Sequence, residues 1–71
     1  MFFFVQVLFH EDGDVVKGTT NYRTMDEAEQ AFHTAIASAI SKPEYHKAIA
    51  IIFGDDGIVR MHRVWKRMEG K

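Results

Sequence analysis

Residues 2–9 read FFFVQVLF, and seven of these eight residues are apolar. A strand with one face in water alternates apolar and polar side chains, because successive side chains point to opposite faces of the sheet. This stretch carries apolar side chains on both faces, and only Gln6 interrupts them. We therefore predict a central strand of a sheet, with a surplus of apolar side chains on the face that points away from the core.

The 71 residues suffice for one domain spanning 1–71, and a content of 46% hydrophobic and 27% charged residues is typical of a globular protein. The sequence contains no cysteine, which fits a reducing compartment and removes thiolate chemistry. No basic residue precedes the apolar run, and the run is far shorter than the ~20 residues of a membrane helix. We expect a cytoplasmic protein with no signal peptide and no membrane partner.

The net charge of −1 gives no general attraction to nucleic acid or membranes. The basic residues are nevertheless unevenly distributed, because five of the nine fall in the last twelve positions. This distribution predicts a local basic edge rather than a basic protein. Its members are Arg60, Arg63, Lys66, Arg67 and Lys71.

Residues 24–41 are predicted to form one amphipathic helix. Thr24, followed three residues later by Glu27, is a capping box, which is typical of a helix start. The helix is expected to end before Pro43, because the residue ahead of a proline avoids the helical conformation. One stripe of the helix is apolar at helical spacing: Met25, Ala28, Phe32, Ala35, Ile36, Ala39 and Ile40.

The first hairpin is predicted around Asp12-Gly13, a dipeptide that favours a two-residue type I′ turn. In that register Phe9 pairs with Val16. The face expected to lie against the helix carries Phe3, Val5, Val7 and Phe9, and the opposite, outer face carries Phe2, Phe4 and Leu8.

The second hairpin is predicted around 55–57, with a three-residue loop and Gly57 in the left-handed conformation. This register separates apolar from polar side chains better than a two-residue turn does. The core face then carries Ile49, Ile51, Phe53, Val59, Met61 and Trp65. The outer face carries Ala48, Ala50, Ile52, Arg60, His62 and Val64.

The element order is therefore ββαββ, an α+β fold. A right-handed helical crossover lets both hairpins join one four-stranded antiparallel sheet, in the order 2-1-3-4 or 1-2-4-3. The most apolar strands belong at the centre of a sheet, which favours 2-1-3-4 with the helix packed on one face.

No constellation of catalytic or metal-ligating residues is predicted. The four histidines (His10, His33, His46 and His62) lack the short spacing of a zinc site, and the acidic turns at 11–14 and 55–57 are explained by hairpin geometry. There is no nucleophile motif and no glycine-rich phosphate loop. We expect no enzyme activity, no cofactor and no small-molecule substrate.

The outer sheet face remains as the candidate site. A patch of about 500 Å² around its phenylalanines reaches the size that marks interaction sites. We predict a protein interface, either in a twofold homodimer or with another protein, so that Phe4→Glu would separate a dimer and leave the helix intact. The interface residues are Phe2, Phe4, Leu8, Ile52 and Val64.

Two alternatives stay open. The outer face is also suited to single-stranded nucleic acid, with Phe4 stacking on a base and Lys17, Arg60 and His62 binding phosphates. In the other alternative, the N-terminal phenylalanines fray or fold over a sheet edge. The net charge and the aliphatic neighbours favour the protein interface over nucleic acid.

Several short features follow one another along the chain: Lys17-Gly18, Tyr22, Thr24, Glu27-Ala28, Phe32-His33, Asp56-Gly57 and Trp65. Their order resembles small uncharacterised proteins encoded by bacteriophages and bacterial prophages. The resemblance implies a cytoplasmic accessory protein of ββαββ form, in a bacterium or a phage-infected host, with no assigned activity and no catalytic residues. Leu8 and Phe9 depart from it, since that group tends to have polar residues there.

Overall fold

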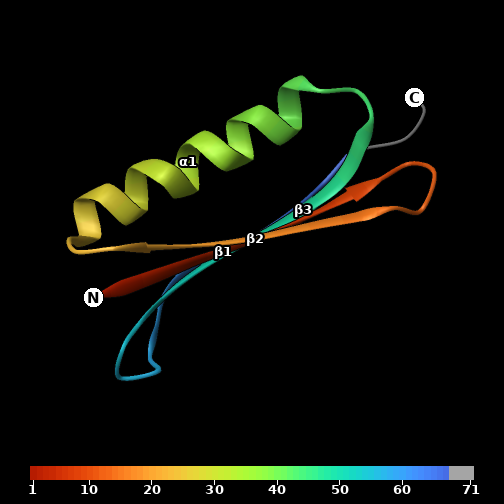
Figure 1. Cartoon of the computed structure of the whole chain (residues 1–71). Helices are drawn as coiled ribbons and strands as arrows, with labels where there is room; N and C mark the ends of the chain where they lie inside the picture. The colour runs from red at the N-terminus through yellow and green to blue at the C-terminus, as the bar shows by residue number, and fades with distance from the viewer. Residues whose placement is uncertain (68–71) are drawn as a thin grey trace.

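The computed structural model describes residues 1–67. Its elements are β1 (Phe2–His10), β2 (Val15–Tyr22), α1 (Met25–Ser41), β3 (Tyr45–Gly54) and β4 (Val59–Lys66). The strands form one antiparallel sheet in the order β2-β1-β3-β4, with α1 on one side of it (Figure 1). The ββαββ fold and the strand order favoured by the sequence are confirmed. Lys71, part of the predicted basic edge, lies outside the described residues.

Helix α1 begins and ends where the sequence indicates. The Thr24 hydroxyl accepts a hydrogen bond from the Glu27 backbone N–H at 3.2 Å, which satisfies one of the free donors of the first turn. Lys42 has an extended backbone and is followed by Pro43. The helix buries four residues of its apolar stripe: Ala28, Phe32, Ile36 and Ala39.

Arg67, which follows β4, binds the C-terminal end of α1. Its guanidinium group donates hydrogen bonds to the carbonyl oxygens of Tyr45 (3.0 Å), Ile40 (3.2 Å) and Lys42 (3.0 Å). The last turn of α1 contains no basic residue of its own. Arg67 therefore supplies the cation that the free carbonyls of a helix C-terminus favour.

The first hairpin differs from its predicted form by one residue. The Gly13 N–H donates to the His10 carbonyl at 3.1 Å, and Gly13 has a φ of 100°, so the loop holds three residues instead of two. The Asp12 carboxylate accepts from the Asp14 N–H at 3.0 Å and stabilises this turn. Phe9 consequently pairs with Val15, and the predicted pairing with Val16 is wrong.

The second hairpin has the predicted three-residue loop, with Gly57 at a φ of 81°. A further irregularity follows it, because Phe53 pairs with Val59 while Ile52 pairs with Met61, which leaves Arg60 without a partner across the ladder. This bulge shifts the rest of β4 by one residue. Ile49 therefore lies opposite Val64, and the core-facing pairs are Ile52 with Met61 and Ala48 with Trp65.

The two faces of the central strands β1 and β3 are the reverse of those predicted, whereas Met61 and Trp65 on β4 lie on the core side as predicted. Phe4 is 4% exposed and Ile52 0%, and both lie in the core with α1, where the Phe4 ring meets Phe32 edge-on at 6.4 Å. Ala48 and Ala50 on β3 lie in the same cluster. Small side chains at these two positions allow α1 to approach the sheet closely, which the larger Ile49 and Ile51 would not. Hydrophobicity alone does not tell which side of β3 faces the helix, because both sides are apolar. Side-chain volume does, because one side carries alanines and the other carries isoleucines.

This assignment of faces is tested by truncating neighbouring isoleucines of β3. Ile52→Ala is expected to lower the free energy of unfolding by about 2–5 kcal/mol, because it removes a fully buried side chain. Ile51→Ala, the matched control one residue away, should cost less than half as much in the monomer, since Ile51 is only half-buried there. Chemical denaturation followed by circular dichroism measures both values, at a protein concentration low enough for the chain to be monomeric. A larger loss for Ile51→Ala would contradict the assignment.

Candidate interaction face of the sheet

The side of the sheet away from α1 carries no second layer of the described chain (Figure 1). Residues paired across antiparallel strands share a face, so the register gives the composition of this surface, which we name the open face. Its centre consists of Phe3, Val5, Val7, Phe9, Ile49, Ile51 and Phe53. Its margins on β2 and β4, together with Lys47 at one end, are Val15, Lys17, Thr19, Asn21, Lys47, Val59, His62, Val64 and Lys66.

The centre of the open face is continuous and apolar. Val5 pairs with Ile51 and Val7 pairs with Ile49, and the rings of Phe3 and Phe53 lie 5.3 Å apart. These side chains are half-buried because they shield one another. At the margins the valines are more exposed, with Val64 at 50%.

The charged groups of the open face are all basic. None of the four strands contains an aspartate or a glutamate. Lys47 and Lys66 pair with each other at the end of the face near His10, and the Lys47 ammonium lies 5.1 Å from the centre of the Phe9 ring. The opposite end of the sheet carries the turn with Asp55 and Asp56. The first hairpin turn, which is acidic at 11–14, lies at the same end as Lys47. The open face therefore carries basic side chains and borders an acidic turn at each end.

Four of the five predicted interface residues do not lie on the open face. Phe4 and Ile52 are buried in the core, and Phe2 and Leu8 pack against it; Val64 alone lies on the open face. The prediction is wrong for these four because of the face reversal described above. Phe4→Glu would place a charge beneath α1 and unfold the protein, so it does not test association.

The residues predicted to contact nucleic acid are separated as well. Lys17 and His62 lie on the open face, opposite Val7 and Ile51, whereas Phe4 lies beneath α1. The Arg60 guanidinium lies 3.1 Å from the position that a Cβ of Gly54 would occupy. Gly54 follows Ile52 on the helix-facing side, so Arg60 is not on the open face.

The open face contains residues that the sequence argument placed in the core, chiefly Phe3, Phe9 and Phe53. One signal in the sequence was available to find them. In β3, alanines at positions 48 and 50 alternate with isoleucines at 49 and 51, and a helix rich in alanine packs most closely on the alanine side. Lys47 lies two residues before Ile49 and therefore on the same side of the strand, so this signal would also have placed Lys47 on the open face.

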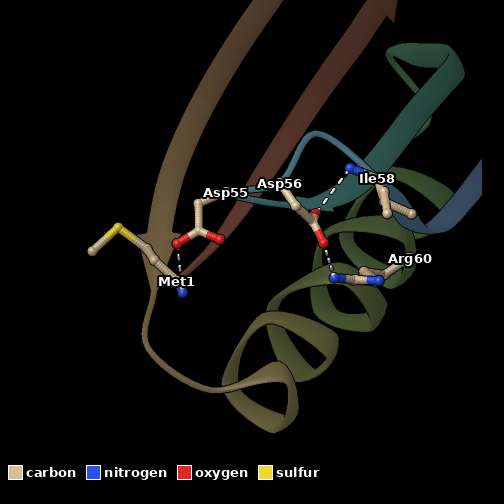
Figure 2. Close-up of polar contacts among 5 residues, drawn as sticks. All are labelled: Met1, Asp55, Asp56, Ile58 and Arg60. Atoms are coloured by element: carbon tan, nitrogen blue, oxygen red, sulfur yellow. Dashed lines mark hydrogen bonds and ion pairs between the residues drawn. The ribbon is translucent and has the colours of Figure 1, made fainter.

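The turn between β3 and β4 holds a local cluster of charges (Figure 2). The Asp56 carboxylate accepts a hydrogen bond from the Ile58 N–H at 3.0 Å and pairs with the Arg60 guanidinium at 2.8 Å. Asp55 lies 3.5 Å from the amino group of Met1. The Ile58 N–H, and after it Arg60, hold the pKa of Asp56 below its ordinary value of 3.8. A Cβ at Gly54 would lie 2.8 Å from the Asp56 carboxylate, so a larger residue there would displace this carboxylate.

The histidines are dispersed through the fold. The ring of His10 lies tilted against that of Tyr45 with ring centres 4.6 Å apart, and His33 lies on the exposed side of α1, 3.9 Å from Glu29. Nδ1 of His46 is buried and has no hydrogen-bond partner among residues 1–67. Within the same range, no group of three histidine or acidic side chains is placed to hold a metal ion.

No protein-family model, curated protein or solved structure matches the chain. No helix among the described residues is long and apolar enough to span a membrane. The open face is therefore the main evidence for function.

The turn cluster predicts how Asp56 responds to pH. Its pKa is lower in the folded state than the ordinary 3.8, so its contribution to stability is complete above that pH and is lost as the pH falls through the folded-state pKa. NMR titration of the carboxyl carbon should give a midpoint below 3.8. In Arg60→Gln the midpoint should rise and still stay below 3.8, because the Ile58 N–H remains. A wild-type midpoint at or above 3.8 would contradict this account.

Proposed function

We propose that the protein acts by binding, without catalysis, and that two copies associate through their open faces. The observation that supports this most is the continuous apolar centre of the open face, with seven apolar side chains on the two central strands and no layer of the described chain over them. A second copy of the chain is also the partner that the sequence favoured. The proposed interface residues are different, because most of the side chains first assigned to the interface lie beneath α1.

The size of the open face suits a dimer. Four strands about 4.8 Å apart and roughly eight residues long give a projected area on the order of 500 Å². Its projecting side chains present an accessible area larger than this projection. A stable interface takes about 800 Å² from each partner, so this face, including its margins, is of the right order for one small dimer.

The charges suit a face-to-face pair of sheets. A twofold axis parallel to the strands places β3 and β4 of one copy over β1 and β2 of the other, which brings Lys47 and Lys66 near the acidic turn at 11–14 of the partner subunit. A twofold axis in the plane of the sheet and perpendicular to the strands instead places Lys47 and Lys66 near Asp55 of the partner subunit. Opposite charges across an interface are favourable in both arrangements, so the charges support association without selecting its alignment.

A second candidate function is binding of single-stranded nucleic acid, and it rests on a different feature of the same face. Phe3, Phe9 and Phe53 lie on the two central strands, and the charged residues of the four strands are all basic. Aromatic side chains on a sheet with neighbouring lysines are the means by which single strands are bound. The aliphatic residues between the rings, such as Val5, Val7 and Ile49, favour the dimer.

A location in the bacterial cytoplasm and an accessory role in a phage or prophage are part of this proposal. They are supported by the absence of cysteine and by the resemblance of the sequence motifs to proteins of that origin. Neither bears on whether the open face self-associates.

The dimer is tested by the mass of the protein in solution. Light scattering after size exclusion should give twice the chain mass at ~100 µM, well above the micromolar dissociation constant of a modest interface. Ile51→Glu should give a folded monomer, because it places a charge at the centre of the open face. Ala37→Glu, on the exposed side of α1, is the matched control and should remain dimeric.

A wild-type monomer at that concentration would overturn the dimer. The nucleic-acid candidate then becomes the one to test, by titrating a fluorescent single strand at two salt concentrations. Binding to phosphates must weaken as salt rises, so binding that is absent or independent of salt would remove this candidate too.

A further inference from the structure

The outer edge of β2 has backbone groups available for another strand. The His10 N–H donates to the Asp14 carbonyl at 2.8 Å, which fixes which residues of the first hairpin exchange hydrogen bonds. In an antiparallel pair the hydrogen-bonded positions alternate. From Asp14 onward, the even-numbered residues form backbone hydrogen bonds with β1. The odd-numbered residues of β2 point their N–H and C=O groups outward, away from β1: Val15, Lys17, Thr19 and Asn21. All four residues are exposed.

The two edges of the sheet differ in how they are protected. Proteins discourage unwanted pairing by placing charged side chains along an exposed edge. The β4 edge carries several, namely Arg60, His62, Arg63 and Lys66. The β2 edge, VVKGTTNY, has Lys17 as its one charged residue. The β2 edge is therefore the better acceptor of an added strand.

A groove of about 610 Å³ runs between α1 and β2, on the side of the sheet opposite to the open face. Gln6 and Gly18 face each other across β1 and β2 at the middle of the groove, and the Gln6 amide nitrogen lies 3.2 Å from where a Cβ of Gly18 would be. The absence of a side chain at Gly18 thus opens the space onto the Gln6 amide. Most of the other residues lining the groove are small or hydroxyl-bearing: Thr20, Tyr22, Ala31, Thr34, Ala35, Ser38, Ala39 and Tyr45.

We propose that an extended peptide segment of another protein binds here as a fifth strand, antiparallel to β2. Its backbone would pair with the outward groups of Lys17 and Thr19. Its residues opposite Gly18 and Thr20 would point to the helix side and enter the groove, because directly paired residues share a face. Small or medium side chains fit these positions.

The ends of the groove set the length and polarity of the peptide. Glu27 lies in the first turn of α1, near the end of β2, and Lys42 lies just beyond the other end of α1. Helix α1 runs back along the sheet in the direction opposite to β2 (Figure 1). The fifteen helical steps from Glu27 to Lys42 span about 22 Å, and an extended peptide covers this distance with about seven residues. A strand antiparallel to β2 then has its N-terminal end at Glu27 and its C-terminal end at Lys42, so we expect a basic residue first and an acidic residue last.

The experiment compares two blocked peptides of identical composition, acetyl-KVTVTVE-amide and acetyl-EVTVTVK-amide, by NMR titration of the labelled full chain. The first should bind about fivefold more tightly, the effect of two exposed ion pairs. In the double variant Glu27→Gln, Lys42→Gln both peptides should bind with equal affinity. Amide shifts should be confined to the β2 edge and the groove, including Lys17, Thr19 and Gln6.

Four results would overturn the proposal: no binding at millimolar peptide, equal affinities in the wild type, unchanged preference in the double variant, or shifts centred on the open face. Pairing of two β2 edges would also overturn it, and would appear as a dimer of Ile51→Glu that Lys17→Glu and Thr19→Pro abolish. Repeating the titration in Ile51→Glu separates these results from the open-face dimer, because the groove lies on the opposite side of the sheet from that substitution.

Discussion

The close packing of α1 on the alanines of β3 determines which side of the sheet is core. Ala48 and Ala50 are each 1% exposed and lie in one cluster with Ala28 and Ala39 of the helix, which are 0% exposed. Small side chains on both layers bring the helix axis near the sheet, and the Phe4–Phe32 contact fills the space beside them. Because side chains alternate along a strand, placing Ala48 and Ala50 toward the helix fixes the side of the sheet on which every other residue of β1 and β3 lies.

The apolar open face is a direct consequence of this packing. A two-layer fold of this size has one helix with which to cover one face, and both central strands are apolar at nearly every position. Phe3, Ile51 and Phe53 are consequently left without a layer over them. The strands contain basic residues and no acidic ones, which gives the bare face its positive character. The open face and the groove beside β2 lie on opposite sides of the sheet.

The sequence was sufficient to predict the order and type of the elements. The Thr24 cap, Pro43 and the apolar character of β1 and β3 led to the helix bounds and to the strand order. The face assignment failed for a physical reason. Both alternating sets of β1 are apolar, so the face depended on hairpin register, and the Asp12-Gly13 dipeptide is compatible with loops of two and of three residues. The bulge at Arg60 had no signal of its own in the sequence. It shifts the pairing of β4 with β3 by one residue, so Met61, Val64 and Trp65 keep their predicted sides although the sides of β3 are exchanged.

The central claim, that Phe4 and Ile52 face the helix while Phe3 and Ile51 face away from it, is tested most directly by proton NOE measurements in solution. The account predicts contacts from the ring protons of Phe4 to Phe32, and from the methyl groups of Ile52 to side chains of α1. It predicts none from Phe3 or Ile51 to any residue of α1. Contacts from Phe3 and Ile51 to Phe32 and Ile36, with none from Phe4, would contradict it.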